Sequence, residues 1–242
     1  MCQHLFNEQK IGTKSKFEKT KGICMKLITI QTKKAYEDLL KNGYLIANSQ
    51  YINRLKYGVP YQYIVDNMQH IENPHKAEFP LWAWVRYGGF VSPPKNKLLG
   101  FFAKDEDEIV RITFEKPDNQ VLVSDYVKYH FLLTNEYLPH NFADLKKFEK
   151  QLQDANISKD DLLAYVRRDK FETYRKDKKF EEINKIIQKS HNNIFSDMGT
   201  FRQGTIWSIE KSEVKKVEII CRKDCTKKAS VDYRKQYIKS LK

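Results

Sequence analysis

The nine residues FPLWAWVRY at positions 79–87 alternate large side chains with smaller ones. Successive side chains of a β-strand point to opposite faces of a sheet, so this pattern predicts a strand with Trp82, Trp84 and Arg86 on one aromatic face. Gly88-Gly89 follows directly and is expected to end the strand.

Other alternating runs predict the rest of one sheet. A hairpin is expected where two apolar runs flank the turn signal Lys116-Pro117-Asp118-Asn119. The strands predicted in addition to 79–87 are residues 25–30, 109–114, 120–123, 205–209 and 214–220.

Both ends of a helix are marked in the region after the first strand. Thr32 is a favourable N-cap and Gly43 a favourable residue after a C-terminus, so residues 33–42 are predicted to be helical. The expected inner face of this helix consists of Ala35, Leu39 and Leu40.

Two further helical regions are predicted downstream. Pro60 is expected at the first position of a second helix, where proline is favoured. Residues 126–195 show helical spacing of apolar residues, and Ser158 with Asp161 resembles a capping box. Because strands from both ends of the chain enclose this helical insert, the sequence predicts a single α+β domain with one mixed or split β-sheet.

The net charge of +13 is concentrated at the two ends of the chain. Residues 1–24 carry +3 and residues 221–242 carry +6, which leaves +4 for the body between them. A face that grips nucleic acid belongs to a folded body, so we expect only weak nucleic-acid contact, through the basic ends. The expected organisation is a flexible leader at 1–24 with Met25 as the native start, a domain at 25–220 and a basic tail at 221–242.

Composition excludes several classes of protein. With 40% hydrophobic and 13% aromatic residues, the chain has the means to bury a core. No apolar stretch reaches the roughly 18 residues that span a membrane, and the N-terminus lacks the apolar core of a signal peptide, so we expect a cytoplasmic protein without membrane contact. Cys2, Cys24, Cys221 and Cys225 lack the spacing typical of zinc sites, so reduced thiols and no metal are expected.

Familiar catalytic motifs are missing: the sequence has no GxGxxG, P-loop, HExxH, GxSxG or CxxC. Candidate ligand-binding residues therefore come from strand ends and faces. Gln31 lies at a strand-to-helix junction, which favours anions. Trp84 offers a flat ring and Arg86 a guanidinium for phosphate or carboxylate. Gln203 and Trp207 share one face of a closing strand.

Asp125 and His130 are the candidate catalytic pair. If Asp125 caps a helix, His130 lies one turn further on, and an Asp–His pair makes a tuned general base. A structural interpretation stays open for each candidate. Thr32 and Gln31 serve as a cap and a strand contact, the tryptophans fill the core, and Asp125 is a plain N-cap beside a half-buried histidine.

A series of short motifs, in this order, resembles an uncharacterised bacterial family of domains of unknown function over residues 25–220. The motifs are Ile30-Gln31, residues 79–84, residues 121–125, Tyr129-His130 with Asn135, Ile194-Phe195 and residues 203–207. That family has no established activity, so the resemblance implies no reaction.

The order of elements also looks faintly like the ADP-ribosyltransferase fold, in particular its small DNA- and RNA-modifying branches. This resemblance implies NAD in a cleft between two half-sheets, with Gln31 at the first strand and Trp84 or Trp207 as the nicotinamide platform. It also implies a carboxylate at the position of Thr205, for which Asp125 or Glu210 is an open substitute.

Three hypotheses follow from these observations. The first is a divergent ADP-ribosyltransferase-like domain that binds NAD or another nucleotide. The second is a non-catalytic interaction module of a mobile-element or defence system. The third is a hydrolase that uses Asp125 and His130. Either enzyme hypothesis requires Gln31, Trp84, Asp125, His130 and Gln203 to converge on one pocket.

Overall fold

The computed structural model describes residues 23–47, 54–102, 106–158, 160–162, 178–225 and 233–241. A six-stranded sheet has the order β5-β6-β3-β1-β4-β8 and is antiparallel at every pairing, and β2 with β7 forms a second, two-stranded sheet. This confirms the α+β prediction. The strands are β1 Cys24–Thr32, β2 Tyr44–Ile46, β3 Leu81–Tyr87, β4 Glu108–Pro117, β5 Leu122–Asp125, β6 Phe201–Ile206, β7 Ser208–Glu210 and β8 Val214–Cys221.

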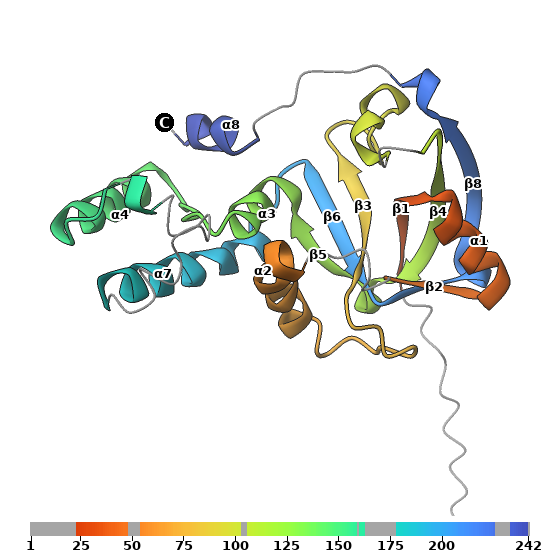
Figure 1. Cartoon of the computed structure of the whole chain (residues 1–242), viewed down its shortest axis with the longest axis horizontal. Helices are drawn as coiled ribbons and strands as arrows, with labels where there is room; N and C mark the ends of the chain where they lie inside the picture. Colours follow the sequence, from red (N-terminus) through yellow and green to blue (C-terminus); the bar gives the residue numbers. More distant parts are fainter. Residues whose placement is uncertain are drawn as a thin grey trace, which may run out of the picture.

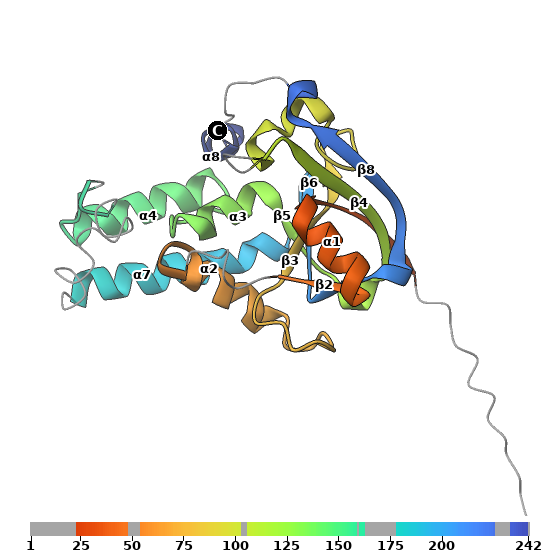
Figure 2. The same ribbon diagram turned by 45° about the vertical axis from the view of Figure 1, so that its right-hand side comes forward.

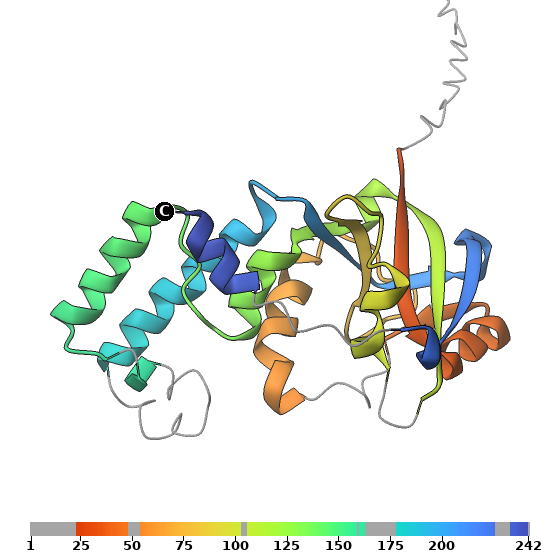
Figure 3. The same cartoon turned by 90° about the horizontal axis from the view of Figure 1, so that it is seen from above.

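Helices lie on both sides of the sheet and extend away from one end of it. The described helices are α1 Lys33–Asn42, α2 Arg54–Asn67, α3 Tyr126–Leu133, α4 Phe142–Asp154, α7 Lys178–Ser190 and α8 Tyr233–Ser240. Figure 1 shows α1 beside the β1–β4–β8 half of the sheet and α3 beside the β5–β6–β3 half. In Figure 3, α4 (green) and α7 (cyan) project away from the sheet, and they share a hydrophobic cluster of their own. None of the described helices has the length and apolarity that a membrane span requires.

The two faces of the sheet are packed by different elements. One face carries Leu27, Ala83 and Ile112, which pack with Leu39 of α1 and Leu45 of β2. On the other face, Trp82 and Trp84 pack against the tyrosines of α3. The view in Figure 2 shows α1 and α3 as separate layers.

The sheet is split between β1 and β3. β1 pairs with β4 along its whole length, from Cys24 to Thr32, and β3 pairs with β6 from Leu81 to Tyr87. Between β1 and β3, both fully described, the register holds the single pair Ile28–Trp84. The C-terminal end of β1 and the N-terminal end of β3 therefore belong to two half-sheets that diverge beyond this pair.

The first helix confirms the prediction from its caps. Thr32 Oγ1 accepts a hydrogen bond from the backbone N–H of Ala35 at 3.0 Å, and Gly43 ends the helix with a φ of 83°. Only glycine adopts such an angle without strain. The expected inner face is partly wrong, since Leu39 is buried but Leu40 is 44% exposed.

The predicted hairpin is wrong. β4 pairs with β1 and β8, whereas β5 pairs with β6, so the two strands lie in different halves of the sheet. The turn signal instead forms a 3-10 turn, Asp118–Gln120, after which Val121 packs against Gly204 of β6. A Cβ on Gly204 would lie 2.7 Å from Val121, so the close approach that places β5 beside β6 requires glycine.

The second helix starts earlier than predicted. α2 begins at Arg54 and includes Pro60 in its interior. A proline inside a helix removes one backbone hydrogen bond. Pro60 and Ile64 of α2 are buried, as is Met68 directly after the helix.

Candidate functional site

A cleft with a volume of about 870 Å³ opens where the two half-sheets diverge. Its lining includes consecutive residues from the end of β1, Ile30 to Thr32, and from β3, Leu81 to Trp84. Consecutive strand residues point to opposite faces. The cleft therefore reaches both faces of the sheet, with α1 and β2 on one side and α3 on the other.

Aromatic rings form the wall on the α3 side. Trp84 and Tyr126 have ring centroids 4.6 Å apart, and Tyr126 and His130 also lie 4.6 Å apart. Trp82 packs against Tyr129 at the same centroid distance. All five residues line the cleft, which gives it flat apolar surfaces of the kind that accept planar rings.

Gln31 is fixed by a short chain of hydrogen bonds at the split. Thr29 Oγ1 donates to the backbone carbonyl oxygen of Trp82 at 2.8 Å, and Gln31 Nε2 lies 2.7 Å from the same hydroxyl. A carbonyl oxygen can only accept, so the single hydroxyl hydrogen goes to Trp82. The group of Gln31 that faces Thr29 must therefore be the NH2 group, and its carbonyl oxygen faces elsewhere.

Gln203 and His130 add further polar groups to the lining. Gln203 is 6% exposed, and its Nε2 donates to Ser124 Oγ at 3.2 Å. His130 Nδ1 lies 2.7 Å from the carbonyl oxygen of Tyr126. Because that oxygen only accepts, Nδ1 carries the hydrogen, and in the neutral ring Nε2 is the acceptor nitrogen.

The first turn of α1 contributes the charged part of the cleft. Lys34 and Asp38 both line it and form an ion pair one helical turn apart. The turn contains no acidic residue, and Thr32 lies at its start. Backbone N–H groups and the helix dipole give such an end a partial positive charge.

Four of the five residues expected to converge do line this cleft: Gln31, Trp84, His130 and Gln203. Asp125 is not among the described lining residues. It is 3% exposed and caps α3 through Oδ1, which accepts from the N–H of Lys128 at 2.9 Å, while Oδ2 accepts from the N–H of Gly199 at 2.7 Å. The structure therefore places Asp125 in the core and His130 in the cleft.

Arg86 and Trp207 also lie away from the cleft. A β-bulge between Trp84 and Arg86 interrupts the expected alternation, and the exposed Arg86 donates to the carbonyl oxygen of Gly88 at 3.1 Å. Trp207 is 5% exposed and donates through Nε1 to the carbonyl oxygen of Ile71 at 3.1 Å. Of the expected ligand-binding residues, Gln31, Trp84 and Gln203 remain together.

Sequence reasoning missed much of the aromatic wall. Tyr126, Tyr129 and Leu133 line the cleft together with the expected His130, and the four follow the i, i+3, i+4, i+7 spacing of one helix face. That spacing is the signal that could have found them. The missed residues also include Tyr61, Phe101 and Tyr44, which reach the cleft from separate parts of the chain.

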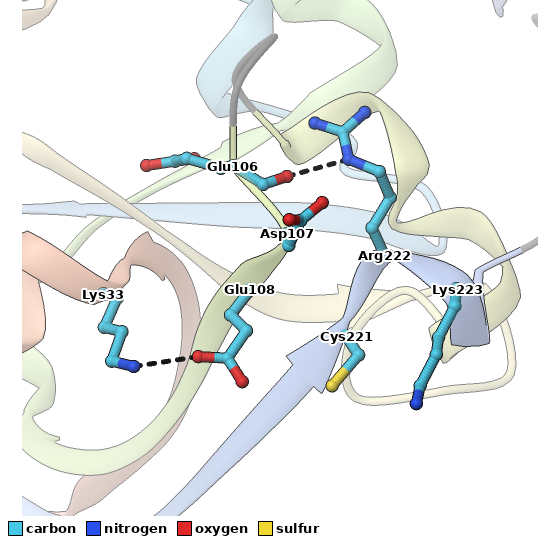
Figure 4. Close-up of a pocket in the computed structure, with 7 residues that line it drawn as sticks. All are labelled: Lys33, Glu106, Asp107, Glu108, Cys221, Arg222 and Lys223. Atoms are coloured by element: carbon cyan, nitrogen blue, oxygen red, sulfur yellow. Dashed lines mark hydrogen bonds and ion pairs between the residues drawn. The ribbon is translucent and has the colours of Figure 1, made fainter.

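A second, smaller depression of about 500 Å³, the outer depression, lies where β4 begins and β8 ends. Figure 4 shows Lys33 Nζ beside Glu108 and Arg222 beside the backbone of Glu106. The first contact is an ion pair of 2.9 Å between side chains that are 56% and 38% exposed. Among the described residues, no group of three or more His, Cys, Asp or Glu side chains is arranged to hold a metal ion.

Residues 26–215 match the model of DUF3841, a family described as a domain of unknown function. The chain belongs to this family. The match confirms the resemblance to an uncharacterised family, and the DUF3841 region includes Gln31, Trp84, His130 and Gln203, whereas α8 follows it. Comparisons with curated proteins and with solved structures give no match.

Proposed function

We propose that the cleft binds a nucleotide, with NAD as one candidate ligand. The observation that carries this proposal is the combination, in one cleft at the split of the sheet, of an aromatic wall with the amides of Gln31 and Gln203. Ligand pockets typically combine mostly apolar walls with a few polar groups in about 300–1,000 Å³, and this cleft fits that description.

The aromatic wall suits the planar part of a nucleotide. Bases and nicotinamide have flat faces, which stack on aromatic side chains such as Tyr126 and Trp84. The glutamine amides offer hydrogen bonds to the edge of such a ring. Apolar ligands without polar edges would leave these amides without partners, at a cost in affinity.

The α1 side of the cleft suits the phosphates. Lys34 carries a positive charge that it shares with Asp38, and the first turn of α1 presents backbone N–H groups and contains no acidic residue. Helix N-terminal turns favour anions through both the N–H groups and the helix dipole. A ligand with a ring at one end and phosphates at the other would therefore use both sides of the cleft.

The proposal is for binding and does not include group transfer. The carboxylate that lines the cleft among the described residues is Asp38, which is paired with Lys34. Thr205, at the position where the ADP-ribosyltransferase resemblance implies a carboxylate, is fully buried and donates to the carbonyl oxygen of Leu122. Glu210 is bonded to His75 and Ser208.

The test is a thermal-shift panel on the full chain with NAD, ADP-ribose, common nucleotides and short oligonucleotides. A ligand that binds the native state alone stabilises it by about 2.7 kcal/mol at a hundredfold excess over Kd. We expect a clear shift with at least one mononucleotide or dinucleotide. A shift with oligonucleotides alone would instead favour nucleic-acid contact through the basic ends.

Substitution of Tyr126 locates the binding site. Tyr126→Ala removes the ring that joins Trp84 to His130 and is expected to weaken nucleotide binding by about 1–3 kcal/mol, the usual value of one base stack. Tyr126→Phe keeps the ring and should bind nearly as well as the wild type. If no nucleotide shifts a cooperatively melting protein, the proposal is wrong and the interaction-module hypothesis takes its place.

A further inference from the structure

We infer that the nucleotide held by the cleft belongs to a single-stranded nucleic acid, and that the loop after β3 binds the neighbouring nucleotide of the strand. This inference rests on the proposed nucleotide binding and adds the substrate class to it. The loop comprises residues 88–102, and Figure 1 shows it beyond the end of β3. Its residues Phe90, Lys97 and Phe101 are called the loop surface below.

The aromatic wall of the cleft continues onto this loop through Tyr87, the last residue of β3. The Tyr87 ring packs edge-to-face on Trp84 with centroids 5.0 Å apart, and Trp84 lines the cleft. Phe101, near the other end of the loop, also lines the cleft. Both ends of the loop therefore adjoin the cleft.

Phe90 lies on the same face as the aromatic wall. The backbone N–H groups of Tyr87 and Phe90 donate to each other's carbonyl oxygens, at 2.7 and 2.9 Å. Two residues that exchange both hydrogen bonds are directly opposite in an antiparallel pair, and their side chains share one face. Because the Tyr87 ring packs on Trp84, that face is the face of the wall. Phe90 is 61% exposed, so its ring can accept a stacked base.

Lys97 gives the loop surface its positive charge. Its Nζ lies 5.6 Å from the centroid of the Tyr87 ring, and among the described residues it forms no ion pair. Lys95 on the same loop is paired with Glu218 at 2.9 Å. Residues 86–102 contain no acidic residue, and the acidic residues 106–108 line the outer depression. An exposed ring beside a free ammonium group is the combination that holds the bases and phosphates of a single strand.

A strand uses this surface more fully than a free nucleotide or a lipid surface does. A mononucleotide in the cleft would leave the Phe90 ring in water. A lipid surface would have to contact Phe90 and Phe101 from one side, but Phe101 lines the cleft. Bases stack one at a time along a strand, so rings at successive positions on a path out of the cleft suit it.

The first experiment compares mononucleotides with short strands by calorimetry on the full chain. The probes are NAD, adenosine and thymidine 5′-monophosphate, and the tetranucleotides tetra(deoxyadenylate), tetra(thymidylate) and tetra(adenylate), the last of which is RNA. We expect at least one tetranucleotide to bind about tenfold more tightly than its mononucleotide, since one further stacked base is worth about 5-fold to 150-fold in affinity. The two adenylate strands distinguish DNA from RNA.

The outcomes separate this inference from the proposed function. Equal affinities for mononucleotides and tetranucleotides would overturn the inference and leave nucleotide binding intact. Absence of binding by every mononucleotide and tetranucleotide would overturn the inference, and the proposed function with it if NAD also fails to bind.

Substitutions of Phe90 locate the second nucleotide. Phe90→Ala is expected to remove most of the tenfold advantage of the tetranucleotide and to leave the affinity for the mononucleotide unchanged. Phe90→Tyr keeps a flat ring and should retain the advantage, whereas Phe90→Leu stays apolar without a ring and should lose it. Since Phe90 is exposed, all three variants are expected to fold. A Phe90→Ala protein that keeps the full advantage would assign the strand to another surface and overturn the inference.

The salt dependence tests the phosphate contact of Lys97. For single strands, each phosphate that a lysine neutralises contributes about 0.7 to the slope of log affinity against log salt concentration. Lys97→Gln should reduce the slope for the tetranucleotide by about this amount. Lys211→Gln removes an equal charge from an exposed position beside Gly43, at the end of α1, and should leave the slope unchanged. Equal reductions in both variants would mean a general effect of net charge and would overturn the contact.

Vesicles of phosphatidylserine and phosphatidylcholine test the lipid alternative. We expect the wild type and Phe90→Ala to sediment with them to the same extent. Vesicle binding that requires Phe90, without any advantage for tetranucleotides, would assign the loop surface to a lipid surface and overturn the inference.

Discussion

The cleft and the outer depression are lined by neighbouring residues of α1 and differ in almost every other respect. Lys33 lines the outer depression, and Lys34 lines the cleft. In both places the lysine forms an exposed ion pair, with Glu108 in the outer depression and with Asp38 in the cleft. In the cleft, rings from β3 and α3 surround a small number of oriented amides. Both volumes, about 500 Å³ and about 870 Å³, are large enough for a small ligand. The two sites differ in the residues that form their walls.

The walls of the two sites differ in how much binding free energy they can supply. An exposed ion pair gains little because both charges are already well solvated. A ligand that binds against the half-enclosed aromatic wall removes poorly hydrated surface from water. The amides of the cleft add affinity only for a ligand that carries matching hydrogen-bonding groups. Trp84 is the residue on which both the cleft and the core depend.

Substitution of Trp84 is expected to have the greatest cost in stability. It is 7% exposed, lines the cleft and packs on Tyr87 and Tyr126. Trp84→Ala is expected to cost about 3–5 kcal/mol of the free energy of unfolding, because it leaves a cavity in addition to lost contacts. Urea denaturation measures this, with Trp84→Phe as a milder control. A cost below about 1 kcal/mol would mean that Trp84 serves the cleft alone.

A smaller effect should separate the two lysines. Lys34→Met removes the positive charge from the cleft and is expected to weaken binding of a nucleoside triphosphate several-fold, with little effect on the nucleoside. Lys33→Met removes an equal charge one residue away, in the outer depression, and should leave both affinities unchanged. Calorimetry at low and moderate salt gives the comparison. Equal losses in the two variants would mean that the effect is a general one of net charge.

The smallest effect concerns pH. Burial lowers the pKa of His191 below its ordinary value of 6.5, although a hydrogen bond to the carbonyl oxygen of Glu136 opposes the shift. Below pH 6.5 the unfolded chain therefore takes up this proton before the folded one, and stability falls with pH in that window. The hydrogen bond that Lys33 donates to Glu108 raises the pKa of Lys33 above its ordinary value of 10.5, so Lys33 stays charged in the same range.

His191→Gln should flatten the acid side of the stability curve. Glutamine can still donate to the carbonyl oxygen of Glu136 but does not take up a proton. Denaturation midpoints measured from pH 7.5 down to pH 5 are expected to fall less in the variant than in the wild type. Parallel curves for the two proteins would remove His191 as the source.

Local signals predicted the elements whose ends are set locally. Thr32 and Gly43 mark α1 because capping and a positive φ depend on neighbouring residues only. The prediction of a hairpin was wrong because a turn signal does not determine which strand a given strand pairs with. The contact of Val121 with Gly204, distant in the sequence, places β5 beside β6 instead.

The cleft was predictable in the same uneven way. Gln31, Trp84, His130 and Gln203 were found because strand ends and faces draw attention to polar and aromatic residues. Asp125 caps α3 as expected but lies outside the cleft, which the sequence did not indicate because an N-cap and a catalytic carboxylate look alike in sequence. Its two oxygens accept from the N–H groups of Lys128 and Gly199, and no local pattern indicates the second of these.

The position of β6 in the sheet has a consequence for synthesis on the ribosome. β1, β3 and β4 leave the ribosome early, but β6 follows α3, α4 and α7 and only then pairs with β3. Until that point the apolar strand with Trp82 and Trp84 has an open edge, and such an edge is a template for association with other chains. Nascent chains that stop before Phe201 should therefore aggregate or require a chaperone, and the segment that begins at Phe201 completes the sheet.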